Sequence, residues 1–192
     1  VLLPPECSIH STATLNMKVD GKNYRTIWVG DDGHTVHIID QTKLPHVFET
    51  KVLNTVEDCV AAIRDMHVRG APLIGATGAY GMALAMRMDA SDESVGGAYD
   101  ALFASRPTAS NLAWALGDLR QRVLQLQPQE RESSAFERAS EICNDDVNTC
   151  KAIGRHGAEI IKNQWMEKGR PSRFNILTHC NAGWLAAVDW GT

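Results

Sequence analysis

Residues 68–88 read VRGAPLIGATGAYGMALAMRM, and this stretch decides the fold of the chain. From Leu73 to Met88 it contains so much Ala, Gly, Leu and Met that no face of a helix formed here would be polar. Such a helix has to be buried on nearly all sides, and its small residues let a second helix approach closely. The sequence therefore predicts a central, buried helix over residues 73–88.

Further helices are expected beside the central one. Thr55, with Asp58 three residues later, is a capping-box signature, and apolar residues then recur at helical spacing up to His67. This helix would be amphipathic. Residues 89–97 are polar and contain glycine, so we expect an exposed link there, followed by a short helix at 98–104.

The second half of the chain also has a mostly helical pattern. A helix is expected to open at residues 106–108 and to carry one apolar stripe, and residues 128–133 are expected to form the loop that ends it. Residues 135–166 keep a helical period, with Gly154 and Gly157 as weak points. One long helix or two shorter helices would fit this segment.

Strand signals are concentrated near the N-terminus. β-Branched and aromatic runs at residues 24–29 and 35–39 flank Gly30-Asp31-Asp32-Gly33 and predict a hairpin, and a third short strand is expected at 46–51. Residues 1–16 show no periodicity, so we expect a flexible leader there and exclude it from the fold. The prediction is an α+β fold, with a three-stranded antiparallel sheet beside a helical bundle.

Residues 175–184 read NILTHCNAGW and carry the most chemistry. Four residues of strand character deliver Cys180 to a tight turn, which opens into a small-residue helix from Leu185. Unpaired N–H groups at a helix start favour a thiolate or an anionic substrate, so this cysteine is a candidate acid–base group or nucleophile. The alternative is a buried cysteine that acts as a small hydrophobe. A direct pair with His179 is disfavoured, because neighbours on an extended segment point to opposite faces.

Arg69 and Arg106 each lie just upstream of a proline at an expected helix start. Proline is tolerated in the first turn of a helix because its missing N–H would have no partner there. A helix N-terminus with a guanidinium nearby forms an anion site, and two such ends that converge would hold a phosphate. Gly70 and Ala71 are small enough for a ligand to approach the backbone. The alternative is a pair of ordinary helix starts with solvent-facing arginines.

Composition limits the class of protein. The 192 residues carry a formal charge of -4 and a pI of about 6.0, so no broad basic field is available for nucleic acid. Five scattered cysteines without a C-x-x-C pair fit free thiols in a reducing compartment, and we expect a cytoplasmic protein. No long apolar run marks a membrane span, and no histidine spacing predicts a metal site.

Four motifs, in this order along the chain, resemble the methylthioribose-1-phosphate isomerase family. They are IDQTKLP at 39–45, MHVRGAPLIG at 66–75, RPTASNL at 106–112 and ILTHCNAG at 176–183. The family interconverts 5-methylthioribose 1-phosphate and 5-methylthioribulose 1-phosphate in methionine salvage, and no cofactor is expected. The resemblance implies a helical domain with a small sheet over residues 17–170, the start of a Rossmann-like domain at 174–192, and a homodimer.

The resemblance also implies roles for single residues. Arg69, Gly70, Ala71 and Arg106 would contact the sugar phosphate. Cys180 would be the catalytic thiol, either as a base or as a stabiliser of the transition state. The arginines would neutralise phosphate charge that otherwise opposes a developing anion.

The chain is expected to be the N-terminal part of a longer enzyme and to be inactive alone. The family's proton-donating aspartate and an Asn-Lys substrate contact belong to motifs that this sequence does not include, and Asp189 is not given that role. Two alternatives stay open. One is a non-catalytic relative of the regulatory subunits of the translation-initiation guanine-nucleotide exchange factor, which generally lack the full RGAP, RPT and THCNAG set. The other is an isomerase of a different sugar 1-phosphate.

Overall fold

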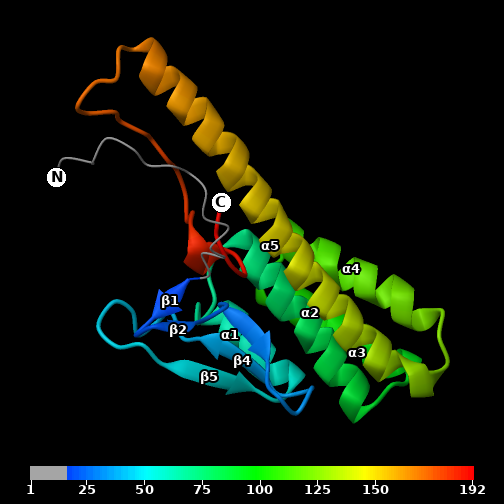
Figure 1. The fold of residues 1–192 in the computed structure, drawn as a ribbon. Helices are drawn as coiled ribbons and strands as arrows, with labels where there is room; N and C mark the ends of the chain where they lie inside the picture. The colour runs from blue at the N-terminus through cyan, green and yellow to red at the C-terminus, as the bar shows by residue number, and fades with distance from the viewer. Residues whose placement is uncertain (1–16) are drawn as a thin grey trace.

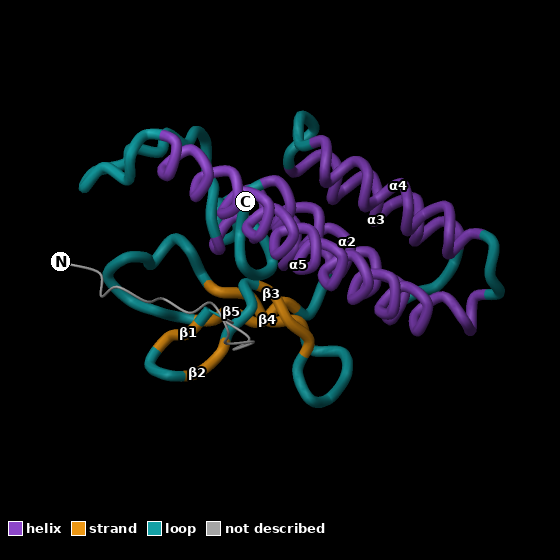
Figure 2. The backbone as a smooth tube through the Cα atoms, turned by 45° about the horizontal axis from the view of Figure 1, so that its top comes forward, coloured by secondary structure: helices purple, strands orange, loops and turns teal. Residues whose placement is uncertain are grey.

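The computed structural model describes residues 17–192, and the leader expected over residues 1–16 lies outside them. The described chain has a layer of helices above a small sheet (Figures 1 and 2). The helices are α1 (Val56–Arg64), α2 (Ala71–Met88), α3 (Asp92–Ser105), α4 (Ser110–Leu124), α5 (Pro128–Glu167) and the short 3-10 turn η1 (Trp184–Ala186). The strands are β1 (Lys18–Val19), β2 (Lys22–Asn23), β3 (Ile27–Val29), β4 (Val36–Ile39) and β5 (Thr50–Leu53). The expected α+β class is confirmed.

The predicted central helix is confirmed as α2. Every residue from Leu73 to Met86 is buried, and α1, α3, α4 and α5 all pack against it. Its glycines allow the close approach, since a Cβ at Gly78 would overlap the Leu112 side chain of α4 and one at Gly81 would press on Leu102 of α3. None of the described helices is long and apolar enough to cross a bilayer.

The three-stranded antiparallel sheet is confirmed, in the order β3-β4-β5. The third strand runs over Thr50–Leu53, later than the expected 46–51, because residues 41–46 form turns instead. A second, two-stranded sheet of β1 and β2 was not predicted. The sequence signal for it was Asp20-Gly21, a pair that favours a two-residue hairpin turn. Both residues have the positive φ that such a turn requires.

Several helix boundaries differ from the expected ones. The Thr55 capping box of α1 is confirmed, but the helix ends at Arg64 and not at His67. The polar link expected over residues 89–97 is wrong, because Ser91 caps α3 through its bond from the Ser94 amide and the helix begins at Asp92. Polar residues in this segment are the first turn of a capped helix.

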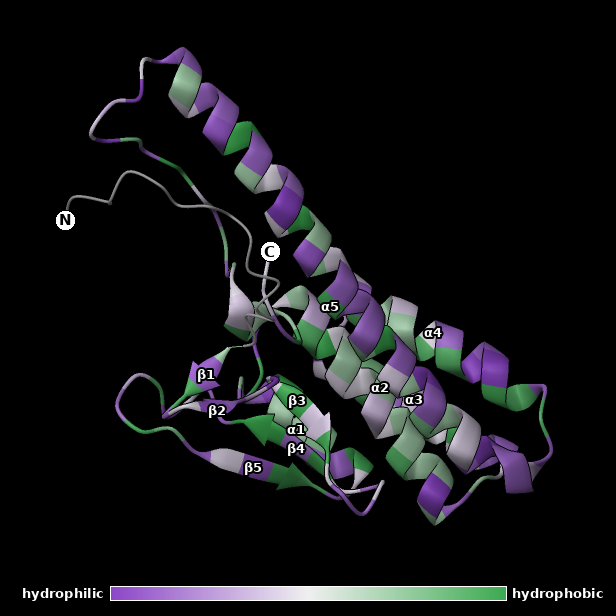
Figure 3. Ribbon diagram, in the orientation of Figure 1, coloured by the Kyte–Doolittle hydropathy of each residue, from purple (hydrophilic) through white to green (hydrophobic). Residues whose placement is uncertain are grey.

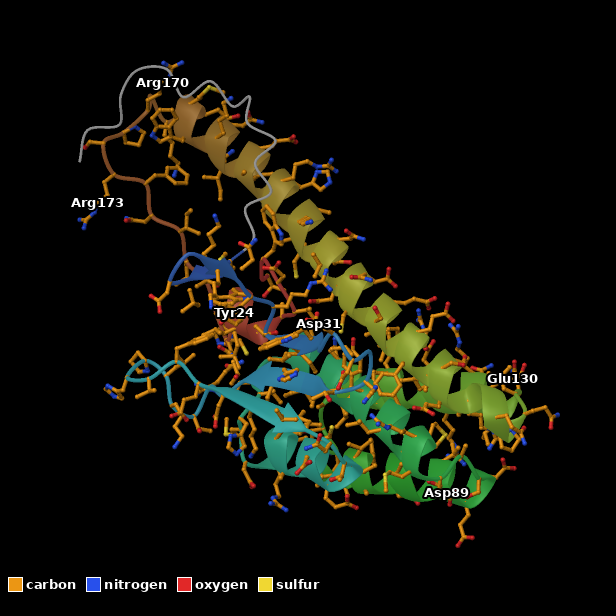
Figure 4. The ribbon with its side chains drawn as sticks, turned by 60° about the horizontal axis from the view of Figure 1, so that its bottom comes forward. Tyr24, Asp31, Asp89, Glu130, Arg170 and Arg173 are labelled. Carbon is orange, nitrogen blue, oxygen red and sulfur yellow. The ribbon has the colours of Figure 1, made fainter. Side chains whose placement is uncertain are left out.

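The segment 128–167 forms one helix of 40 residues, so the loop expected at 128–133 is wrong. Pro128 lies in the first turn, and Gln127 with Glu130 forms a capping box. No residue of α5 beyond Cys150 is buried, and this distal half projects away from the other helices (Figure 1). It is mostly hydrophilic with a few apolar positions (Figure 3), and Glu130 and Arg170 mark opposite ends of the helix (Figure 4).

The strand expected over residues 175–178 is not formed, and the following helix is only the 3-10 turn η1. A strand needs the backbone of a neighbour to complete its hydrogen bonds, and none of the strands within residues 17–192 pairs with this segment. The expected start of a Rossmann-like domain is therefore not confirmed. Residues 173–179 instead run without regular structure towards the turn at Cys180.

Candidate active site

The first predicted site motif lies where α2 begins. Gly70 is the residue before the first helical turn, with φ of 103°, and its carbonyl accepts from the Ile74 amide at 3.0 Å. Pro72 lies in the first turn, as predicted, and no side chain caps this end of the helix. Ala71 is exposed there. The start of α2 therefore combines an uncapped helix N-terminus with a small exposed residue, which suits an anion.

Arg69 is half-buried beside this helix start. Its Nη2 donates to the backbone carbonyl of Gln41 at 3.2 Å. Its Nε is buried and has no hydrogen-bond partner within the part of the chain that the structure describes. The guanidinium is thus fixed through Nη2, while its Nε–H is still available to donate to a ligand. The alternative of a purely solvent-facing arginine does not hold for this motif.

Gln41 holds Arg69 in place and was given no role by the sequence. It is only 1% exposed. Its backbone N–H donates to the His67 carbonyl at 3.0 Å, and its side-chain amide donates to the Leu185 carbonyl at 2.6 Å. The only available sequence signal was its place in the IDQTKLP motif, because the burial of a single glutamine leaves no periodic pattern.

Asp40 supports the same turn. Its Oδ1 accepts from the Thr42 amide at 2.9 Å and from the Thr42 hydroxyl at 2.6 Å, and it lies 2.8 Å from His67 Nδ1. The His67 contact has the distance of an ion pair without the alignment of a hydrogen bond. Burial is the largest single effect and raises the pKa of Asp40, but the bonds from Thr42 and the contact with His67 together hold that pKa below its ordinary value.

The turn after Cys180 is docked against the sheet and helices. Thr26 donates from its hydroxyl to the Ala187 carbonyl at 2.6 Å, and its amide donates to the Val188 carbonyl at 3.0 Å. The Val188 amide in turn donates to Asp146 Oδ2 of α5 at 2.7 Å. These bonds join residues 187–188 to Thr26, just before β3, and to α5, and they fix the position of the turn.

Gly70 and Ala186 bring the helix start and this turn into direct contact. A Cβ at Gly70 would overlap the backbone of Ala186. The structure therefore places Arg69 and Gly70 against the segment that begins a few residues after Cys180.

Cys180 itself is exposed and has φ of 65°. Of the four cysteines that the structure describes, the other three, Cys59, Cys143 and Cys150, are buried. The alternative of a thiol sealed in the core is therefore wrong for Cys180. No hydrogen bond joins it to His179 in the described chain.

Arg106 is not placed as predicted. It ends α3, where its amide donates to the Phe103 carbonyl at 3.3 Å, and α4 begins only at Ser110. Pro107 therefore lies in the connection and does not open a helix. None of the hydrogen bonds or ion pairs found in residues 17–192 involves the Arg106 guanidinium, although the start of α4 lies close to α2, since a Cβ at Gly75 would press on Asn111.

A pocket of about 280 Å³ lies next to the start of α2. It is lined by Pro72, Gly75, Asn111, Trp114, Ile142, Asp145, Asp146, Thr149, Cys150, Ile153 and Thr192. Its walls are mainly apolar, and its charged residues are two aspartates. The two carboxylates would repel a phosphate there, so this pocket does not suit the predicted anionic ligand.

Comparison with known proteins places the chain in a family. The model of the Initiation factor 2 subunit family matches residues 67–188, which is more than half of the chain. The chain belongs to this family. The Initiation factor 2 subunit family match includes both the helix start at Gly70 and the turn around Cys180.

The relatives that the chain matches include methylthioribose-1-phosphate isomerases. That of Rhodospirillum centenum is 55% identical over 177 residues, covering 92% of this chain and 47% of its own length. That of Escherichia coli is 53% identical over 176 residues, with the same shares. The chain thus spans about half the length of the curated relatives that it matches.

Two solved structures have the same fold. The 5-methylthioribose 1-phosphate isomerase of Pyrococcus horikoshii matches with a TM-score of 0.74 and 35% identity, over 89% of this chain and 47% of its own. The subunit delta of translation initiation factor eIF-2B from A. fulgidus matches with a TM-score of 0.73 and 35% identity, over 88% and 48%. The fold alone does not separate an enzyme from a translation factor.

Proposed function

We propose that the protein containing these residues is an aldose–ketose isomerase, which interconverts 5-methylthioribose 1-phosphate and 5-methylthioribulose 1-phosphate in methionine salvage. We further propose that it works in the cytoplasm as a homodimer. The observation that carries the proposal is the identity of 53–55% with proteins named as this isomerase, over 92% of the chain. Residues 1–192 alone are expected to be inactive, because those relatives are about twice as long.

The substrate explains which groups the reaction needs. Its anomeric carbon is phosphorylated, so the sugar cannot open to a free aldehyde before hydrogen moves between C2 and C1. An acid has to protonate the ring oxygen as the ring opens, and a second group has to manage charge or a proton near C1 and C2. In this proposal Cys180 is the second group, and the acid comes from outside residues 1–192.

The surroundings of Arg69 support a role in binding phosphate. The uncapped start of α2 offers backbone donors and a positive dipole end, and the Arg69 Nε is buried without a partner in the described structure. Gly70 and Ala71 complete the proposed contact. Arg106 is proposed to join them, and this part of the proposal rests on the RPT motif and the relatives alone.

Isomerisation of methylthioribose 1-phosphate by the whole protein and by its Cys180→Ser variant tests the proposal. We expect wild-type turnover and a loss of several orders of magnitude in the variant, with unchanged folding by circular dichroism. Wild-type turnover in the variant would refute the catalytic role proposed for Cys180. Absence of turnover in the wild type would refute the proposal that the protein is this isomerase.

The match to subunit delta of eIF-2B supports a second candidate, a non-catalytic regulatory subunit. Under that proposal the whole protein would show no turnover on any pentose 1-phosphate and would act through protein contacts. An isomerase of another sugar 1-phosphate would instead show turnover on ribose 1,5-bisphosphate or 5-deoxyribose 1-phosphate in the same assay. One substrate panel therefore distinguishes the three possibilities.

A further inference from the structure

Three segments that are far apart in the sequence meet at one buried glutamine. The backbone carbonyl of Gln41 accepts from Arg69 Nη2 at 3.2 Å, and its side-chain amide donates to the Leu185 carbonyl at 2.6 Å. We propose that Gln41 is a positioning residue, which fixes the turn after Cys180 relative to the proposed phosphate contact of Arg69. This inference rests on the proposed function of Cys180 and Arg69.

The two contacts of Gln41 are chemically separate. Arg69 is held by the backbone, so any residue at position 41 can make that bond. Leu185 is held by the side chain, and only a donor of the right length reaches its carbonyl. Because Gln41 is 1% exposed, water does not readily replace the lost bond, and the carbonyl of Leu185 would be left without this donor.

Other residues also hold the same turn, but they bind it at later positions. Thr26 and Asp146 bond to residues 187–188 and make no hydrogen bond to Arg69. Gln41 is the residue that hydrogen-bonds both to Arg69 and to the turn, at the point closest in sequence to Cys180. Removing its amide should therefore shift the thiol while the guanidinium stays in place.

The proposal makes a specific kinetic prediction. A misplacement of about 1 Å between reacting groups costs on the order of a hundredfold in rate, whereas the phosphate contacts at Arg69 depend on the backbone. Loss of the Gln41 amide is therefore expected to lower kcat by about 10- to 100-fold and to change KM by less than about threefold.

The test uses Gln41→Met in the whole protein, because methionine fills the same buried volume without a donor. Arg131→Met is the matched control. Arg131 is 4% exposed and donates to the carbonyls of Leu126 and Ala90, near Glu130 at the far end of the bundle (Figure 4). Turnover, thermal stability and the rate of Cys180 alkylation by iodoacetamide are measured for both variants.

We expect the Gln41→Met variant to lose kcat and to alkylate Cys180 at a rate at least about threefold different from wild type. The Arg131→Met variant is expected to lose stability with kcat unchanged. Equal losses of kcat in the two variants at equal loss of stability, or wild-type kcat and alkylation in Gln41→Met, would overturn the proposal.

A second variant and a second measurement cover the cases in which Gln41→Met does not fold or the wild type shows no turnover. If Gln41→Met does not fold, Gln41→Asn replaces it, since its amide is one carbon too short for Leu185, and the same outcomes apply. If wild type shows no turnover, the proposed function fails, and the alkylation rates alone decide the inference. Unchanged alkylation of Cys180 in the variant would then refute the coupling.

Discussion

Position 70 at the candidate site tolerates residues other than glycine poorly, for two reasons. Its φ of 103° is unfavourable for any residue with a Cβ, and an added Cβ would overlap the Ala186 backbone. We expect Gly70→Ala to lower the free energy of unfolding by about 1–2 kcal/mol from backbone strain and by about 1–3 kcal/mol from overpacking. Urea unfolding measures this loss.

Gly96→Ala is the control for that substitution. Gly96 lies inside α3 with no atom within 4 Å of an added Cβ, so alanine there should stabilise the helix by about 0.5–1 kcal/mol. If both variants shift stability in the same direction, the packing of Gly70 against Ala186 is not the reason for the glycine.

Asp146, which accepts a hydrogen bond from the Val188 amide, makes the stability of the fold depend on pH. Burial is the main effect and raises the pKa of this carboxyl above 3.8, although the bonds from the Val188 amide and Cys150 oppose it. Its favourable contribution is therefore complete below the unfolded pKa and is lost as pH rises through the folded pKa. Asp146→Asn keeps an acceptor for the Val188 amide but does not titrate.

We therefore expect the stability of Asp146→Asn, relative to wild type, to increase as pH rises from about 3 to about 7. Guanidinium unfolding across this range measures the difference. A relative stability that falls with pH would mean that the Val188 bond outweighs burial and that the pKa of Asp146 is lowered.

At the level of elements, α5 combines a packed half with an exposed half. Gly154 and Gly157 lie in the exposed half with no atom within 4 Å of an added Cβ. We expect Gly154→Ala and Gly157→Ala each to stabilise the distal helix by about 0.5–1 kcal/mol and to slow amide exchange over residues 152–167. Hydrogen exchange read by mass spectrometry measures it.

Gly117→Ala in α4 is the matched control, because Gly117 also has nothing within 4 Å but lies in a helix packed on α2. It should leave exchange over residues 152–167 unchanged. Unchanged exchange in the Gly154 and Gly157 variants as well would show that helix propensity does not limit the opening of this half.

The sequence predicted the long periodic elements, but it misplaced helix starts, overlooked a short hairpin and predicted a strand that finds no partner. The central helix followed from composition alone, because a stretch without a polar face has to be buried. The segment 175–178 has strand character, but a strand also needs a neighbour, and the described chain provides none. Pro107 and Pro128 carry the same helix-start signal, yet only Pro128 opens a helix.

The candidate site divides in the same way. The helix start at Gly70 and the exposure of Cys180 could be predicted or weighed from nearby residues. Gln41 could not, because its two contacts, with Arg69 and Leu185, span 28 and 144 positions. Long-range polar contacts of single residues leave no period in the sequence, so the structure was needed to find this one.

At the scale of the whole molecule, the reactivity of the cysteine thiols indicates how far the fold has opened. Burial raises the pKa of Cys59 and Cys143, and it raises the pKa of Cys150 to about 11, so these three are both shielded and protonated at neutral pH. Cys180 is exposed. We expect iodoacetamide to modify Cys180 rapidly in the native protein and the three buried thiols only as the fold opens.

Peptide mapping over a time course tests this, with Cys7, which lies outside the described residues, followed separately. The three buried thiols come from α1 and α5, which both pack on α2, so a cooperative fold opens them together. Their rates should converge as urea is raised towards the unfolding midpoint. If Cys150 reacts much earlier than Cys59, the α5 side opens independently, and the turn held by Asp146 opens with it rather than with the core.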